Sequence, residues 1–357
     1  MNKKALSLLA VLALGSFAGC GTKESSSETP AAKKYSVGLG YSYKYEYTED
    51  DATTTDVNEE LGQVDMTVAF AAFDEAGKVY DVRFDVVQVK FTANEARTGI
   101  VLTNKNVDDT YSVTSKLELG AAYGMLGNPY GSTLAEVDTQ IEAFADWCVG
   151  KTADEVVAGT PGAGHVEAVN DELANSVTIT VDEFENALKD AYARKSTATY
   201  ELSGTAGVAM QSGLAYNYGD PSTDVSVDVA GVIAKDGAVE VALIDAIVVP
   251  MDFETAIAVK NDNYYVKDGA LRSKKVLGDE YGMKGYENHE TGAVCTLEWY
   301  EQAAIVENAA KGKTKDQISA FVANEGELAG ATITLTNYFR ALAKATDYAG
   351  RTVIAAR

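Results

Sequence analysis

The sequence predicts an α+β fold made of two tandem homologous repeats, each a small antiparallel sheet packed with helices. Three observations predict this class: motifs that recur in the same order, paired strand-like segments around tight turns, and helical spacing after each pair. Strands followed by helices within one unit are typical of α+β domains. The 357 residues are enough for two ordinary domains, each with its own core.

Several motifs recur along the chain at nearly constant spacing. The recurring segments, each with its match in the second half, are residues 115–125 with 273–283, 150–152 with 312–314, and 178–180 with 332–334. The first pair is identical at more than half of its positions. Repetition on this scale indicates two domain-sized copies rather than a solenoid. We expect repeat 1 over residues 35–195 and repeat 2 over residues 198–350.

Each repeat contains a predicted hairpin. The strand-like segments, rich in β-branched and aromatic residues, are 64–73 with 79–89 in the first repeat and 225–234 with 239–249 in the second. The first pair surrounds a turn at 74–77 that ends in glycine. The second surrounds Asp236-Gly237, and Asp-Gly is a strong signal for a two-residue hairpin turn.

Helical patterns follow each hairpin. The expected helices cover residues 134–149 and 297–310, then two short helices that begin at Thr152 and Thr314, then two final helices from near 181 and 335. Gly150 and Gly312 stand where a helix end favours a left-handed residue. Thr152 with Glu155, and Thr314 with Gln317, have the spacing of a capping box. The segments around Tyr123 and Tyr281 are expected to be loops.

The N-terminus has the pattern of an export signal. Lys3 and Lys4 precede an apolar stretch at residues 5–18, which is too short to span a bilayer. The stretch ends in Phe-Ala-Gly-Cys20, which resembles the lipobox of bacterial lipoproteins. By that resemblance, residues 1–19 are a signal peptide, and Cys20 is lipidated and followed by a flexible linker to residue 34. We expect an extracytoplasmic protein anchored in the cell membrane by lipid; an ordinary signal peptide with an incidental cysteine is the alternative.

The composition excludes several classes of function. Lys and Arg number 30 against 53 Asp and Glu, so the net charge of −23 argues against nucleic acid as a partner. Two histidines and three cysteines leave little material for a His/Cys metal cluster. Cys148 and Cys295 lie in or beside apolar helical patterns, which favours two buried thiols. A disulfide between them is the alternative in an exported protein. No catalytic residue and no metal ligand can be named.

Two further features have an ordinary and a functional interpretation. Tyrosines at positions 35, 41, 43, 45 and 47 share one face of a strand. Such a face covers the strand's own domain or, less commonly, stacks on a planar ligand or a partner strand. Lys116 and Lys274 occupy matching positions. The ordinary interpretation is that each forms a salt bridge with a neighbouring carboxylate; the functional one is that each contacts a phosphate or carboxylate of a ligand.

Residues 329–334, Ala-Gly-Ala-Thr-Ile-Thr, resemble the Ser-Gly-Ala-Thr-x-Thr stretch of the FMN-binding domain family. The family includes the C subunit of sodium-pumping NADH:quinone reductase and flavin lipoproteins of Gram-positive bacteria. In it, a threonine of the motif carries FMN through a phosphoester bond made by a flavin transferase. The resemblance implies that Thr332 is the attachment site, that Gly330 and Ala331 let the backbone lie near the phosphate, and that Thr178 is a second candidate. It also implies that Tyr281 and Met283 lie near the isoalloxazine ring.

The resemblance departs from the family pattern at two positions. Gly326 stands where the family has an acidic residue, and Ala329 replaces a serine or threonine. The stretch is therefore also compatible with a turn and strand that end in a helix cap. We expect a cell-surface electron carrier that meets a flavin transferase and membrane redox proteins. The alternative is a cofactor-free ligand-binding or structural lipoprotein; neither requires a turnover enzyme.

Overall fold

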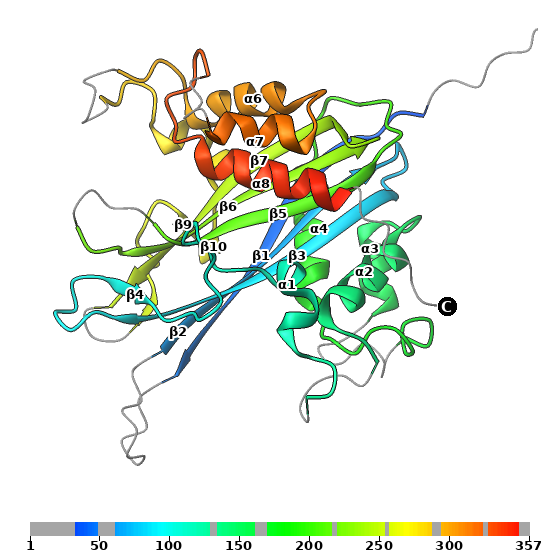
Figure 1. Cartoon of the computed structure of the whole chain (residues 1–357), viewed down its shortest axis with the longest axis horizontal. Helices are drawn as coiled ribbons and strands as arrows, with labels where there is room; N and C mark the ends of the chain where they lie inside the picture. Colours follow the sequence, from blue (N-terminus) through cyan, green and yellow to red (C-terminus); the bar gives the residue numbers. More distant parts are fainter. Residues whose placement is uncertain are drawn as a thin grey trace, which may run out of the picture. The chain divides into compact units, whose positions relative to one another are not determined.

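The computed structural model describes residues 33–48, 61–128, 134–160, 170–215, 220–253, 257–287, 294–323 and 328–349. These residues form antiparallel sheets covered by helices, so the predicted α+β class is confirmed (Figure 1). The predicted signal peptide, Cys20 and the linker as far as residue 32 lie outside the described residues.

The first sheet has four antiparallel strands in the order β1-β2-β3-β4. Its strands are β1 (Ser36–Thr48), β2 (Leu61–Phe73), β3 (Val79–Ala93) and β4 (Ile100–Leu102). The predicted hairpin is β2 with β3, and Gly77 closes its turn with φ of 77°. A glycine fits this left-handed conformation without the steric cost that other residues bear.

The second sheet repeats the same order as β5-β6-β7-β8. Its strands are β5 (Thr205–Leu214), β6 (Asp224–Lys235), β7 (Ala238–Asp252) and β8 (Ala258–Val259). Asp236 and Gly237 both have positive φ, as the predicted Asp-Gly turn requires. A separate two-stranded ribbon consists of β9 (Val266–Lys267) and β10 (Ala270–Leu271).

The helices follow the strands in the same succession in both halves. The first half has α1 (Lys116–Leu119), the 3₁₀ helix η1 (Gly120–Tyr123), α2 (Val137–Cys148), α3 (Ala153–Gly159) and α4 (Asp182–Ala193). The second has α5 (Lys274–Leu277), η3 (Gly278–Tyr281), α6 (Trp299–Ala310), α7 (Lys315–Ala323) and α8 (Thr336–Ala349). Homology of the two halves stays a prediction from the sequence.

The local helix signals behave as expected at two kinds of position. Thr152 and Thr314 make the predicted capping boxes with Glu155 and Gln317. Gly150 and Gly312 are left-handed just after α2 and α6. The expectation of loops around Tyr123 and Tyr281 is correct only after these residues. Each tyrosine ends a short 3₁₀ helix, η1 or η3, and the glycine and methionine that follow it lie outside helices and strands. The preceding helices α1 and α5, capped by the side chains of Ser115 and Ser273, were not predicted.

Each sheet is buried on both faces over most of its length, although alternate residues at the end of β1 are exposed. The helix-facing sides form separate cores, with α4 on β1 and β2 in the first half and α8 on β5 and β6 in the second (Figure 1). The opposite sides share one core to which both sheets contribute; for example, the ring of Phe70 on β2 lies against Gly231 on β6. Burial on both faces explains why the sequences of these strands are nearly continuous runs of apolar residues.

The tyrosines of β1 lie on the side of this shared core. Tyr41, Tyr43, Tyr45 and Tyr47 pack against it, so they do not cover the first half alone. The hydroxyls of Tyr41 and Tyr45 donate to the carbonyls of Leu271 and Ile257 in the second half. Both remaining cysteines, Cys148 and Cys295, are free and buried, in agreement with the favoured interpretation.

Substitution of Gly40 should destabilise the protein because β1 and α4 touch at this residue. An added Cβ would lie 2.1 Å from the Ala191 nitrogen and 2.2 Å from the Ala187 oxygen, both backbone atoms. We expect Gly40→Ala to lower the free energy of unfolding by about 3 kcal/mol in urea denaturation. Gly213→Ala is the control, since its Cβ would meet only the Tyr111 oxygen, at 3.2 Å. Equal losses in the two variants would contradict this packing.

Candidate functional site

A cleft of about 870 Å³ gathers three of the residues that the resemblance to FMN-binding domains singles out. Thr332, Tyr281 and Met283 all line it, together with the aromatic rings of Trp299 and Tyr265. Its other lining residues include Tyr111, Asp224, Asp228, Lys274, Asn337 and Tyr338. The volume is within the range of sites for small molecules and cofactors.

Thr332 is exposed and held in place by a buried glutamine. Its backbone N–H and its hydroxyl donate to Oε1 of Gln302, at 2.6 and 3.2 Å. The Ile333 N–H donates to the same oxygen at 3.1 Å, and the Cys295 Sγ lies 3.3 Å from the threonine hydroxyl. Gln302 itself is only 1% exposed, so the cleft wall is anchored to the core through α6.

The other residues of the predicted motif lie apart from the cleft lining. Gly330 is exposed and left-handed, with φ of 92°, and Ala331 donates its N–H to the Leu328 carbonyl. Neither belongs to the described residues that line the cleft. Gly326, where the family has an acidic residue, lies outside the described residues.

Thr178 has the same local geometry but a different surrounding. Its N–H and hydroxyl donate to Oε1 of Gln140, at 2.7 and 3.0 Å. Thr178 is not among the described residues of the large cleft. The sequence reasoning missed Gln140 and Gln302, although a signal was present: both are polar residues on the core-facing side of matching helices, 162 residues apart.

Side-chain contacts from α6 also fix the segment that carries Tyr281 and Met283. The Glu298 carboxylate accepts the N–H groups of Met283 and Lys284, at 2.9 and 3.2 Å. The Gln302 amide donates to the Met283 sulfur at 3.4 Å. The wall of the cleft thus depends on Gln302 of α6 and on Glu298, the residue that caps this helix.

Lys274 brings a positive charge to the cleft. Its ammonium lies 5.3 Å from the centre of the Tyr281 ring and 5.8 Å from that of Trp299, within the range of cation–π attraction. Among the described residues it forms no ion pair within 4.0 Å, so the expected salt bridge is absent there. Burial raises the pKa of Asp228, and the charge of Lys274 opposes that rise.

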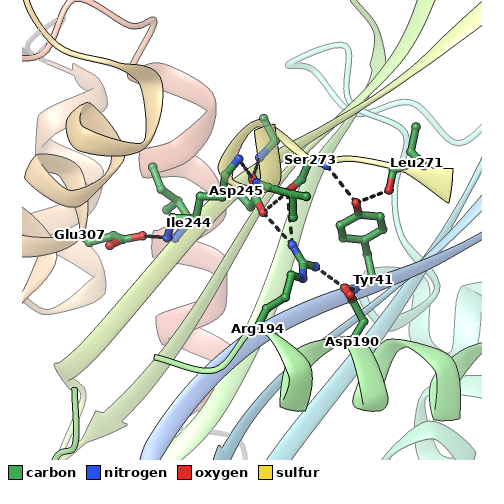
Figure 2. A network of polar contacts seen from close by, with 11 residues as sticks. Tyr41, Asp190, Arg194, Ile244, Asp245, Leu271, Ser273 and Glu307 are labelled. Atoms are coloured by element: carbon green, nitrogen blue, oxygen red, sulfur yellow. Dashed lines mark hydrogen bonds and ion pairs between the residues drawn. The ribbon is translucent and has the colours of Figure 1, made fainter. Parts of the chain in front are cut away.

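A polar network between the halves holds the start of α5 (Figure 2). The Asp245 carboxylate, which is 2% exposed, accepts the Ser273 hydroxyl at 2.6 Å and pairs with Arg194 at 3.3 Å. The Arg194 guanidinium also pairs with Asp190 and lies 4.5 Å from the Tyr41 ring centre. Since Ser273 caps α5, the network sets where Lys274 stands.

Among the described residues, the matching carboxylate of the first half, that of Asp85, has no arginine or lysine as an ion-pair partner. Asp85 Oδ1 accepts the N–H groups of Val86 and Leu117, at 2.7 and 3.1 Å, as Asp245 does with Ala246 and Lys275. Oδ2 of Asp85 has no hydrogen-bond partner within the described part of the chain. Burial raises the pKa of Asp85 to about 7.

The residues of the cleft fit FMN in three respects. Thr332 is an exposed residue of the lining that carries a hydroxyl, the aromatic rings of Tyr281 and Trp299 offer faces for a planar ring system, and Lys274 supplies a cation for a phosphate. For metals, the described residues contain no group of three His, Cys, Asp or Glu side chains that could hold an ion. No described helix is long and apolar enough to cross a membrane.

Comparisons with protein-family models, curated proteins and solved structures found no match to this chain. The resemblance to FMN-binding domains therefore stays a prediction from residues 329–334.

Asp85→Asn should flatten the pH dependence of stability. Because the pKa of Asp85 rises from 3.8 to about 7 on folding, the folded state binds this proton more tightly. The stability that this bound proton contributes is fully present below the pKa of the unfolded chain, 3.8, and is lost as the pH rises through the pKa of the folded protein, about 7. Roughly 3 pKa units correspond to about 4 kcal/mol. We expect the free energy of unfolding to fall between about pH 4 and pH 7 in the wild type and to fall much less in the variant.

Asp245→Asn is the matched control because it removes the partner of Arg194. We expect it to lower the free energy of unfolding by about 3 kcal/mol at both pH values, since a partly buried cation loses its counter-charge. Asp85→Asn should be at least as stable as the wild type at the higher pH. If its pH profile coincides with that of the wild type, the unpaired carboxylate is not the titrating group.

Proposed function

We propose that the chain is a membrane-tethered flavoprotein that carries electrons outside the cytoplasm, with FMN esterified to Thr332. One observation carries the proposal: Thr332, Tyr281 and Met283, chosen from the sequence, line the same cleft. The tether is the lipid expected on Cys20, and two or more acyl chains anchor a protein stably where one does not. The flavin would supply the redox chemistry, and the protein would set access to it and its potential.

The surroundings of Thr332 support its use as an acceptor hydroxyl. A flavin transferase would join the threonine oxygen to the FMN phosphorus of a flavin dinucleotide, while the phosphate–phosphate bond breaks and a nucleoside monophosphate leaves. The hydroxyl proton is directed at Gln302 Oε1, which leaves an oxygen lone pair free of that contact. Because the backbone N–H of Thr332 binds the same amide, the side chain is held in one place for the transferase.

The cleft walls support the binding of a flavin ring. Tyr281 and Trp299 flank the ammonium of Lys274, so an aromatic surface and a cation lie together. Met283 adds a polarisable thioether to the lining, and sulfur packs well against aromatic rings. A planar ring with an anionic tail needs these two kinds of contact.

A cofactor-free ligand-binding lipoprotein is the second candidate. It is favoured by the carboxylates of Asp224 and Asp228, which line the cleft beside its single described ammonium, Lys274. Such a lining suits a neutral or cationic polar ligand better than a free anion. Covalent attachment distinguishes the two candidates, because an ester holds FMN in the cleft regardless of these charges.

The proposal is tested by producing the chain together with a flavin transferase that is active on a known substrate. We expect a yellow protein whose intact mass exceeds the unmodified mass by one FMN less one water. Thr332→Val should abolish both the colour and the added mass, because the acceptor oxygen is gone. The absorption spectrum and mass are recorded before and after denaturation to separate ester-bound from free flavin.

Thr178→Val and Thr334→Val are the controls for this experiment. The first removes the hydroxyl with the same glutamine contact in the other half, and the second removes a neighbouring hydroxyl of the same cleft. Both should keep the full modification at Thr332. A colourless wild type of unmodified mass would reject covalent FMN and leave the ligand-binding candidate, whereas loss of modification only in Thr178→Val would move the site to the first half.

A further inference from the structure

A second cavity, of about 360 Å³, lies in the first half against β3 and α1. Lys90, Lys105 and Lys116 line it, with the polar side chains of Gln88, Thr103, Asn104, Asn106 and Thr114. No described lining residue is an aspartate or glutamate. Three ammonium groups around one cavity are unexpected in a chain with a net charge of −23.

The wall that carries these lysines is built by specific hydrogen bonds. Asn104 accepts the Lys90 N–H at 2.6 Å and donates to the Gln88 carbonyl at 2.9 Å. Asn106 donates to the Thr114 carbonyl at 2.9 Å. Lys105 is therefore the residue between two anchored asparagines, and its side chain is exposed.

The polar groups of the cavity have unused hydrogen-bonding capacity. Lys90, Lys105 and Lys116 form no ion pair within the parts of the chain that the structure describes; Lys116 instead lies 5.2 Å from the Tyr123 ring centre. The Thr103 hydroxyl is buried and has no hydrogen-bond partner among those same residues. A buried hydroxyl without a partner costs free energy, and a ligand that accepts its proton would recover it.

The corresponding cleft of the second half has a different charge. Lys116 with Tyr123 matches Lys274 with Tyr281, and both pairs have the same cation–π distance within 0.1 Å. On the strand, however, Lys90 comes five residues after the buried Asp85, whereas Pro250 comes five after Asp245. Lys90 thus has no lysine counterpart at the matching strand position of the second half.

We infer that this cavity binds the phosphate group of a small molecule or a lipid headgroup. Lysine ammonium groups act as point charges and are common phosphate ligands, whereas bidentate recognition of carboxylates favours arginine. The free Thr103 hydroxyl supplies a neutral donor to the remaining oxygens, and so does the one N–H of the Gln88 amide and of the Asn106 amide that no hydrogen bond among the described residues uses. The inference does not depend on flavin at Thr332, because it uses other residues in the other half.

The test is a calorimetric titration of the full chain in detergent, without flavin transferase, with inorganic pyrophosphate. We expect binding by the wild type that weakens with added salt, as screened charges require. Lys90→Gln with Lys116→Gln should weaken binding by roughly tenfold or more for each lysine. Lys105→Gln alone, on an exposed side chain that the fold does not need, should weaken it by about tenfold.

The matched control is Lys235→Gln with Lys311→Gln, which changes the net charge equally at exposed positions outside the cavity. An equal loss of binding in the control would overturn the inference. Absence of pyrophosphate binding would overturn it if the vesicles of the parallel arm also fail to bind. A parallel arm uses vesicles that contain phosphatidylglycerol. Binding to these vesicles alone, lost in the Lys105 variant and kept in the control, would support the phosphate site and assign its source to a lipid headgroup.

Discussion

The contact on which the larger cleft depends is the ion pair between Arg194 and Asp245. A carboxylate buried in the middle of β7 must be hydrogen-bonded and balanced by a charge, because water cannot solvate it there. Arg194 comes from the end of α4 in the other half of the chain, so the requirement also joins the two halves. Through Ser273 it determines where α5 begins, and therefore where Lys274, Tyr281 and Met283 lie.

The first half also buries an aspartate at the matching position, but without an arginine beside it among the described residues. Asp85 makes the same two backbone contacts to the strand and to α1, yet no arginine reaches it among the described residues. The raised pKa of Asp85 is the physical consequence, since burying a neutral carboxyl costs less free energy than burying an unpaired carboxylate. The start of α1 is thus held by a group that titrates near neutral pH, and the start of α5 by a charge pair.

Local signals predicted much of the fold, and long-range contacts explain what the sequence did not predict. The hairpins, the capping boxes at Thr152 and Thr314, and the two final helices follow from residues a few positions apart. The shared core between the sheets and the Arg194 contact join residues far apart in sequence, which periodicity cannot pair. In the candidate site, the resemblance identified Thr332, while its partner Gln302 required knowledge of how α6 packs.

The two cavities show how little change is needed to alter the chemistry of one architecture. In both, a lysine that begins a short helix lies over the tyrosine that ends the next one, and a buried aspartate holds that helix to the sheet. These contacts fix the backbone, so the ligand class is decided by the residues around them. Lysines at 90 and 105 make the first cavity cationic, whereas aromatic rings, Thr332 and the carboxylates at 224 and 228 make the second aromatic and mixed in charge. Because these frame contacts do not use Lys90, Lys105 or Thr332, either lining can change while the frame stays in place.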